Sequence, residues 1–375
     1  MAAAEAQAPL ASTAGELDMP PELERRRLRS RLLIAAGLVA LVVAVIILAP
    51  GLESLRERFA HGRPGWLAAG AVLKVLSGLS YVVVFRAIFC RRMTWRLSYH
   101  IGMSELGANA LFPTGGAGGL ALGAWALRRG GMPAAHIAKR TVAFFFLTSA
   151  ANVGAVIVVG IGLATGLFPG KVSLALSLIP VAVAVLGVAA TLGAGRLAAL
   201  AHDRLEARNP HRRSRTERIL SAISGGVTEA LVLLRSGDRQ LIAGALGYLA
   251  FDVMVLWTTF HAFGSPPPLA ILWMAYLIGE LGGLVPLPGG IGGVDAGLVG
   301  TFVLYGAPLA AATAAVLAYR AIALWVPAML GAVAFVALRR TLRREADEIA
   351  LCAPGTEMEV VGLGRVVVQP PTPAS

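Results

Sequence analysis

Hydrophobic positions fill long uninterrupted stretches of this chain, and polar positions gather between them. Six stretches are long enough to cross a hydrocarbon core about 30 Å thick, which takes about 20 apolar residues in an α-helix. They are residues 32–48, 66–89, 142–167, 172–195, 241–263 and 309–338. The pattern therefore predicts an all-α fold, a polytopic membrane helical bundle with six full spans.

The composition agrees with a membrane protein. Of the 375 residues, 57% are hydrophobic and only 14% are charged, whereas a soluble domain has about 25% charged residues. The net charge of +12 would suit a nucleic-acid-binding protein. However, the basic residues gather at the ends of the apolar stretches, in clusters at 24–31, 91–96, 196–239 and 339–344. This distribution is typical of cytoplasmic loops, so we expect no nucleic-acid partner.

The basic clusters also predict an orientation in the cell inner (plasma) membrane, with both termini cytoplasmic. Two further apolar regions must then begin and end on one side of the membrane. Residues 97–127 begin and end inside, and residues 269–306 begin and end outside. We therefore expect two broken re-entrant hairpins besides the six spans.

The two re-entrant regions resemble each other, with SELGANALFPTGGAGG at 104–119 and GELGGLVPLPGGIGG at 279–293. In both, a proline follows the Glu-Leu-Gly glutamate by eight residues and precedes paired glycines. The matching residues are Glu105, Pro113, Gly115, Gly116, Gly118 and Gly119 in the first copy, and Glu280, Pro288, Gly289, Gly290, Gly292 and Gly293 in the second. The opposite orientations of the copies predict an inverted repeat with halves at about 65–165 and 240–338. Two unrelated glycine-rich loops are the alternative.

Helix breakers inside apolar sequence point to a binding site. Proline and glycine unwind a helix and free backbone groups that lipid cannot satisfy, so such backbone is tolerated only inside protein or beside a wet cavity. The N-terminal ends of the resulting half-helices favour an anionic group. We therefore expect a polar site near the middle of the membrane.

At this point the sequence resembles a known family. The stretch PLPGGIGGVDAGLVG at 286–300, with AYRAIALWVP at 318–327, is similar to the lysylphosphatidylglycerol synthase transmembrane region, also called the flippase-like domain family. The resemblance covers about residues 30–340 and implies that the chain moves a lipid. The synthases add an aminoacyl-transferase domain, for which the residues after Arg340 are too few.

Three positions depart from the family pattern. Asp295 stands where many relatives have glutamate, and Leu120 and Ala121 stand where relatives often have an acidic residue. In addition, Lys139-Arg140 replaces a Glu-Arg pair. The Asp295 departure is conservative, whereas the departures at 120–121 and 139–140 weaken the transfer of charge partners to the first half.

Ionisable residues within the spans carry the site hypothesis, because each costs about 2.5–3.5 kcal/mol on insertion scales. We expect Arg320 to pair with Glu280, or to bind a lipid phosphate in competition with Glu280 or Asp295. Glu105 and Arg140 are the expected counterparts in the first half. The other candidates are Asn109, which either binds a headgroup or satisfies unwound backbone, Lys74, which is paired or cavity-facing, and Asp252, which accepts a buried hydrogen bond or relays protons. Tyr276 is expected at a membrane interface.

No nucleotide, hydrolase or metal motif is present, so we expect no enzyme activity, cofactor or metal, although an intramembrane transferase stays an alternative. Cys90 and Cys352 adjoin predicted cytoplasmic clusters, so we expect no structural disulfide. Residues 1–30 and 341–375 are expected to be disordered cytoplasmic tails around a membrane domain at 31–340. Within the cytoplasmic basic loop at 196–240, the spacing predicts an amphipathic helix over 215–235 lying on the inner leaflet.

The predicted function is translocation of an anionic lipid or lipid-linked precursor between leaflets. Two alternatives remain: a secondary transporter of a small solute, and a non-transporting partner of an envelope-lipid synthase. Anionic membrane lipids are the expected partners in the first case.

Overall fold

The computed structural model describes residues 53–111, 117–170, 172–208, 215–280 and 293–352, and these residues form helices and short connections. In chain order the helices are α2 (Glu53–Ala60), α3 (Pro64–Phe89), α4 (Trp95–Leu111), α5 (Ala117–Arg129), α6 (Ala134–Ala164), α7 (Leu174–Arg208), α8 (Arg215–Arg235), α9 (Arg239–Phe263), α10 (Leu269–Glu280), α11 (Gly293–Leu304) and α12 (Leu309–Ala350). The all-α prediction is confirmed for the described residues.

Four described helices are long and apolar enough to cross a membrane, namely α3, α6, α9 and the first 37 residues of α12. They match four of the six predicted spans. The predicted span 172–195 falls within α7, whose apolar part runs from Leu174 to Ala190. The predicted span 32–48 lies outside the described residues.

The outer helices present apolar side chains where a soluble protein would present polar ones. Val158 on α6 is 62% exposed, Leu186 on α7 is 68% exposed and Val333 on α12 is 72% exposed. Large apolar side chains exposed on several helices identify a surface that meets lipid rather than water.

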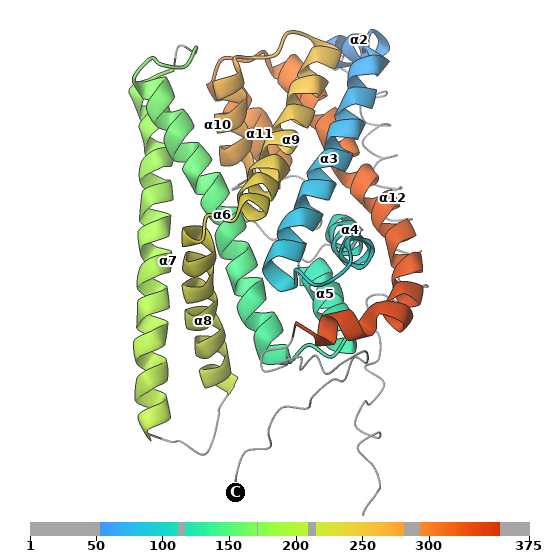
Figure 1. Cartoon of the computed structure of the whole chain (residues 1–375). Helices are drawn as coiled ribbons and strands as arrows, with labels where there is room; N and C mark the ends of the chain where they lie inside the picture. The colour runs from blue at the N-terminus through green and yellow to red at the C-terminus, as the bar shows by residue number, and fades with distance from the viewer. Residues whose placement is uncertain (1–52, 112–116, 171, 209–214, 281–292, 353–375) are drawn as a thin grey trace, which may run out of the picture.

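Two pairs of short helices lie at opposite ends of the bundle (Figure 1). The pair α4 and α5 lies at the end where α3 finishes, and the pair α10 and α11 lies at the end where α9 finishes. Helices α3 and α9 run antiparallel beside each other. The start of α3 meets the end of α9, where the amide of Arg63 donates to the carbonyl of Ala262 (3.1 Å). The inverted repeat stays a prediction, and this arrangement is the one it requires.

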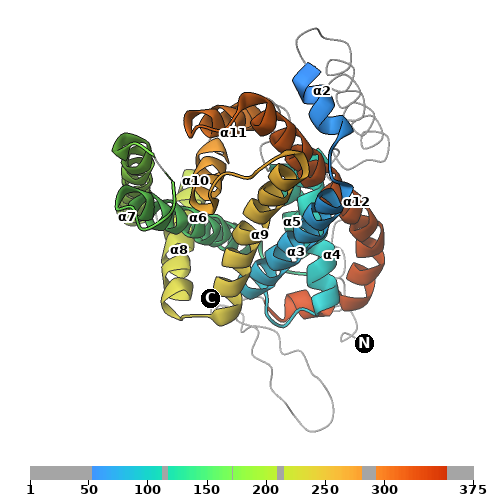
Figure 2. The same cartoon turned by 90° about the horizontal axis from the view of Figure 1, so that it is seen from above.

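Close contacts between glycines hold α12 against α4. A Cβ atom on Gly331 of α12 would fall less than 3.0 Å from backbone atoms of Gly107 and Met103 in α4. Farther back along α12, Pro327 interrupts the helical hydrogen bonds, and α12 curves around α3, α4 and α5 in the view from above (Figure 2). Small residues at a crossing let two backbones approach closely within a membrane.

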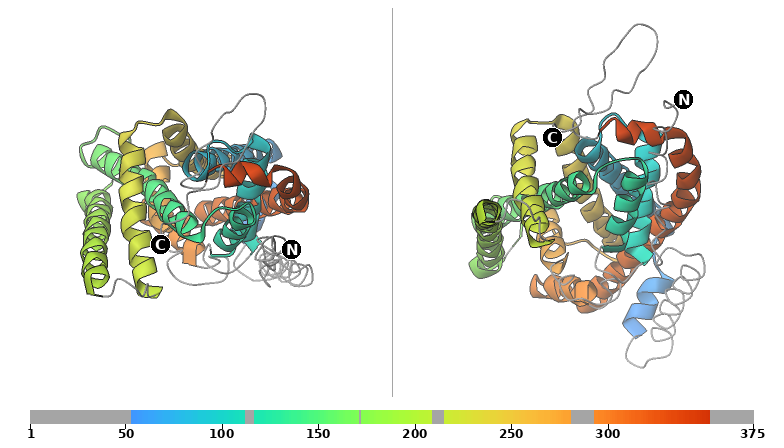
Figure 3. Two further views of the ribbon diagram at one scale, coloured as in Figure 1. Left: turned by 60° about the horizontal axis from the view of Figure 1, so that its bottom comes forward. Right: turned by 90° about the horizontal axis from the view of Figure 1, so that it is seen from below.

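The region between the halves forms a helical hairpin from the end of α7 and α8. The helix predicted at 215–235 is confirmed, since α8 has these bounds. However, α8 stands beside α6 and α7 along their length rather than across their ends (Figure 1 and Figure 3). Val227 and Ala230 of α8 are buried in this packing, and the placement of α8 on the inner leaflet stays a prediction.

Two expectations about the C-terminal part of the chain are wrong. Helix α12 continues to Ala350, so residues 341–350 are helical rather than a disordered tail. Glu348 of α12 accepts a hydrogen bond from the amide of Thr94 at the start of α4 (2.8 Å). This contact brings Cys352 beside Cys90, and the two form a disulfide with a Cα–Cα distance of 5.7 Å. Residues 353–375 and 1–52 lie outside the described residues.

Candidate functional site

Asp252 of α9 is the centre of a buried polar network. Its Oδ2 accepts hydrogen bonds from the hydroxyls of Tyr276 on α10 (2.8 Å) and Tyr319 on α12 (3.2 Å). Its Oδ1 accepts a hydrogen bond from the hydroxyl of Ser77 on α3 (3.2 Å) and forms an ion pair with Lys74, also on α3. A buried charge is stable only when it is paired and hydrogen-bonded, and Asp252 meets this condition through donors from three other helices.

The close packing of α3 on α9 brings Lys74 within contact distance of Asp252. A Cβ atom on Gly244 of α9 would contact Val83, Val84 and the Ser80 carbonyl of α3. Because Gly244 lacks a side chain, the two backbones approach closely enough for Lys74 and Asp252 to meet. Lys74 was expected to be paired or cavity-facing, and Asp252 to be hydrogen-bonded; both predictions are confirmed.

Arg320 of α12 pairs with Asp295 of α11, not with Glu280 as the sequence suggested. Its Nε lies 2.7 Å from Oδ1 of Asp295, and the two side chains are 24% and 22% exposed. Asp295 lies in the first turn of α11, where the helix dipole favours a negative charge. The prediction of an Arg320–Glu280 pair is wrong because α11 places its own acid against α12.

Glu280 ends α10 and is exposed. It nevertheless lies within electrostatic range of Asp252, Arg320, Lys74 and Asp295. These five residues therefore form one group, which we call the central cluster. It contains two bases and three acids and is contributed by α3, α9, α10, α11 and α12.

The first half places its equivalent residues differently. Glu105 of α4 is only 4% exposed and accepts a hydrogen bond from the hydroxyl of Tyr81 (2.8 Å). Arg140 of α6 pairs with Glu229 of α8 (3.0 Å) and donates to the Ile88 carbonyl at the end of α3 (2.7 Å). Glu105 and Arg140 thus each have partners of their own, and their part in substrate binding stays a prediction.

Asn109 satisfies backbone in the described structure, one of its two expected roles. Its Oδ1 accepts a hydrogen bond from the amide of Gly119 in the first turn of α5 (2.9 Å). The first-turn amides of a helix have no partner within the helix, so a side-chain oxygen there acts as a cap. Asn109 therefore joins α4 to α5.

The two Gly-Pro boxes, which we define as the prolines and paired glycines at 113–119 and 288–293, lie mostly outside the described residues. Of the residues expected to bind substrate, Pro113, Gly115, Gly116, Pro288, Gly289, Gly290 and Gly292 lie outside the described residues. Gly293 is the first residue of α11. The central cluster therefore begins at the edges of the second box, with Glu280 before it and Asp295 after it.

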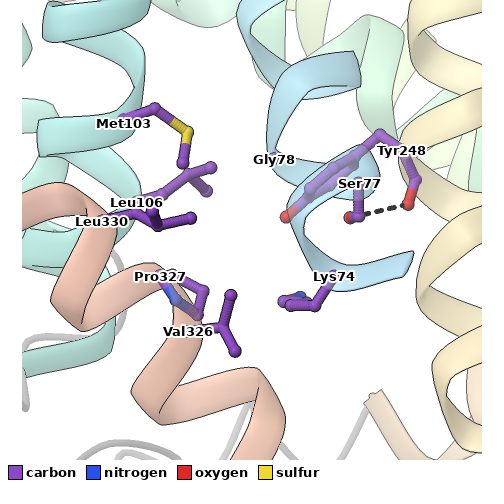
Figure 4. A pocket seen from close by; sticks show the side chains of 9 residues that line it. All are labelled: Lys74, Ser77, Gly78, Met103, Leu106, Tyr248, Val326, Pro327 and Leu330. Carbon is purple, nitrogen blue, oxygen red and sulfur yellow. Dashed lines mark hydrogen bonds between the residues drawn. The ribbon is translucent and has the colours of Figure 1, made fainter. Parts of the chain in front are cut away.

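A small pocket adjoins the central cluster at Lys74. Figure 4 shows Lys74 and Tyr248 facing it from α3 and α9, with Met103, Leu106, Val326 and Leu330 of α4 and α12 on the opposite side. One side of the pocket is therefore polar and the other apolar.

Sequence reasoning missed part of the network around Asp252. Tyr276 was expected at a membrane interface, yet it is 7% exposed and its hydroxyl donates a hydrogen bond to Asp252. Tyr319 and Ser77 were not singled out, although Tyr319 directly precedes Arg320. Hydropathy cannot distinguish a buried tyrosine from an interfacial one, because both have apolar neighbours in sequence. Among the described residues, no group of histidine, cysteine, aspartate and glutamate side chains could hold a metal ion.

Comparisons with known proteins agree with this structure of apolar helices around a polar cluster. The sequence model described as "Lysylphosphatidylglycerol synthase TM region" matches residues 32–331. A UPF0104 membrane protein of Methanothermobacter thermautotrophicus is 31% identical over 120 residues, 31% of this chain. The match spans about a third of that relative's own length, 36%. The chain is thus a multi-pass membrane protein, and it belongs to the family of the lysylphosphatidylglycerol synthase transmembrane region.

Proposed function

We propose that this protein moves an anionic lipid, or a lipid-linked precursor, between the two leaflets, and that the lipid phosphate binds Arg320. The observation that carries the proposal is the Arg320–Asp295 ion pair, partly exposed among apolar helices at the first turn of α11. Arginine suits this role because its planar guanidinium binds phosphate oxygens in a bidentate manner.

The acids around Arg320 support an exchange mechanism. Without a lipid, Asp295 neutralises Arg320, which keeps an uncompensated charge out of the membrane. An arriving phosphate carries the same charge as Asp295 and competes for the same guanidinium. Glu280, which is exposed and close in electrostatic terms, repels the phosphate and so favours its release. Binding is then strong enough for selection and weak enough for turnover.

The placement of the two halves supports movement between leaflets. The pairs α4–α5 and α10–α11 lie at opposite ends of the bundle (Figure 1), as expected for halves that serve opposite sides of the membrane. The exposed apolar side chains of α6, α7 and α12 allow the acyl chains of a lipid to stay in the bilayer while its headgroup crosses through protein.

Native mass spectrometry of gently purified protein tests the proposal. We expect wild type to retain phosphatidylglycerol over phosphatidylcholine, both supplied at equal concentration. Arg320→Gln should lower retention about tenfold, because a hydrogen bond to a charged group contributes about 1.5–3 kcal/mol. Asp295→Asn removes the competitor and keeps the arginine, so it should raise retention.

The outcomes separate the alternatives. Equal retention by wild type, Arg320→Gln and Asp295→Asn would make the pair structural and would contradict lipid binding at this site. Transport is then measured in proteoliposomes, by the loss of fluorescence of a headgroup-labelled phosphatidylglycerol on reduction from outside. A protein that binds the lipid without moving it would behave as a partner of a synthase rather than as a flippase.

A further inference from the structure

The pocket beside Lys74 has donors on one side and apolar side chains on the other. Lys74 offers an ammonium group, and Tyr248 offers a hydroxyl that has no hydrogen bond within the described ranges. Met103, Leu106 and Leu330 face them across the pocket (Figure 4). This division matches an amphiphile with an anionic headgroup and a hydrocarbon chain.

The Lys74–Asp252 pair is built so that it can open. Lysine carries its charge on a flexible four-carbon stem, so its ammonium can leave one partner for another. If Lys74 leaves, Asp252 still accepts hydrogen bonds from Ser77, Tyr276 and Tyr319. The carboxylate therefore loses one of four donors rather than its whole solvation. This lowers the free-energy cost of separating the pair.

We propose that this pocket is a second position for the lipid phosphate, which Lys74 binds after exchanging Asp252 for it. The inference rests on the proposed function for the identity of the amphiphile as a lipid. Arg320 and Lys74 then mark two successive stations, each with a carboxylate that takes the cation back when the phosphate moves on. Glu280 lies within electrostatic range of both cations.

The surroundings of the pocket favour a lipid over free phosphate. Leu106, Val326 and Leu330 are only half-buried. Next to them on α12, Met329 is 65% exposed and Val333 is 72% exposed. An acyl chain leaving the pocket past Leu330 would therefore continue along an apolar surface. A free phosphate would gain nothing from these contacts and would lose water.

The decisive test uses two substitutions with opposite expected effects. Lys74→Gln removes the cation, and we expect binding of phosphatidylglycerol to fall about tenfold, as for the loss of a charge-assisted hydrogen bond. Asp252→Asn keeps the tyrosine and serine contacts and releases Lys74, so binding should rise. A purely structural pair predicts that both substitutions weaken binding, which would overturn the proposal.

A photo-crosslinker reports on this pocket separately from Arg320. We would place p-benzoylphenylalanine at Leu330, which lines the pocket, and as a control at Leu186 of α7, which is 68% exposed and does not line it. Crosslinking of phosphatidylglycerol from position 330 should be lost in Lys74→Gln and should rise in Asp252→Asn. Crosslinking from position 186 should not change. Equal crosslinking from 330 in all backgrounds contradicts the proposal.

The Arg320 and Lys74 variants together separate the second position from the proposed function. If Arg320→Gln lowers lipid retention while Lys74→Gln leaves the 330 crosslink intact, the proposed function stands and the second station is wrong. If Lys74→Gln alone acts, the second station stands and the Arg320 site is wrong. Inorganic phosphate as competitor separates the sources: free phosphate that abolishes the 330 crosslink at millimolar concentration would identify a phosphate-ion site.

A double variant separates loss of lipid binding from loss of folding. Lys74→Gln combined with Asp252→Asn removes both charges and keeps hydrogen-bonding groups at both positions, so neither charge is left buried without a partner. The double variant should elute as wild type in size exclusion and should bind phosphatidylglycerol as weakly as Lys74→Gln. Wild-type binding by the double variant would overturn the proposal.

Discussion

The two halves of the molecule carry similar sequence boxes but use their charged residues differently. In the first half, Glu105 is buried against Tyr81, and Arg140 is turned toward Glu229 and a backbone carbonyl. In the second half, Arg320 and Glu280 belong to one central cluster with Lys74, Asp252 and Asp295. The comparison indicates that Glu105 and Arg140 fix neighbouring helices, whereas Arg320 and Glu280 lie among the charges of the central cluster.

Asp252 shows how the halves depend on each other. Its ion-pair partner, Lys74, comes from α3 of the first half, whereas Tyr276 and Tyr319 come from α10 and α12 of the second. The first half thus contributes one of the two cations of the central cluster. A movement of α3 relative to α9 would therefore change the charge balance of the central cluster.

The largest effect is expected at the glycine crossing that both halves share. Gly331→Leu places a side chain on the backbone of α4, and neither backbone can yield as a flexible side chain would. We expect the variant to lose its folded, monodisperse peak in size exclusion, since overpacking alone costs about 1–3 kcal/mol and here separates two helices. Gly154→Leu is the control, because a Cβ there meets nothing within 4 Å. A folded Gly331→Leu protein would contradict the close crossing.

The next effect separates the two arginines. Arg320→Gln should reduce retained phosphatidylglycerol about tenfold. In contrast, Arg140→Gln should leave retention within about twofold of wild type, because its half-exposed pair with Glu229 contributes about 1 kcal/mol or less, and only to stability. Native mass spectrometry of both variants measures the difference. Equal losses would mean that Arg140 also binds lipid and that the two arginines do not differ in role.

Two tyrosine substitutions test how strongly each buried acid, Glu105 or Asp252, depends on its hydrogen-bond donor. Tyr81→Phe removes the hydrogen bond found for the Glu105 carboxyl among the described residues, so the free energy of unfolding should fall by about 1–3 kcal/mol. Tyr276→Phe leaves Asp252 with Ser77, Tyr319 and Lys74, so the loss should be about 0.5–1.5 kcal/mol. Thermal unfolding in detergent, followed by tryptophan fluorescence, gives the order. A larger loss for Tyr276→Phe would show that Asp252 is less well supported than its contacts suggest.

Much of this fold could be predicted because the bilayer restricts the choices. A run such as 241–263 has no alternative to a spanning helix, so hydropathy alone located α9 and three other described spans. Pairing could not be predicted in the same way. Arg320 follows two candidate acids, Glu280 and Asp295, and only the packing of α11 on α12 shows which one it pairs with.

The cysteine pair illustrates the same limit over a longer distance. Cys90 and Cys352 are separated by 262 residues, and the redox argument from the basic clusters pointed to free thiols. Their meeting depends on the helical end of α12 and on its Glu348–Thr94 contact. No local pattern encodes that contact. Local chemistry was informative only where the partners are near in sequence, as for Asn109 and Gly119.

Asn109 gives the smallest expected effect and a direct test of the first half as scaffold. Asn109→Ala removes the acceptor for the Gly119 amide in the first turn of α5, and loss of such a cap costs about 1 kcal/mol. We expect a slightly lower midpoint of thermal unfolding, with retention of phosphatidylglycerol unchanged. Asn109→Asp keeps the acceptor and should preserve the midpoint. If Asn109→Ala instead lowers lipid retention at an unchanged midpoint, Asn109 contacts a headgroup. The residues around Asn109 would then have to be counted as part of the binding path.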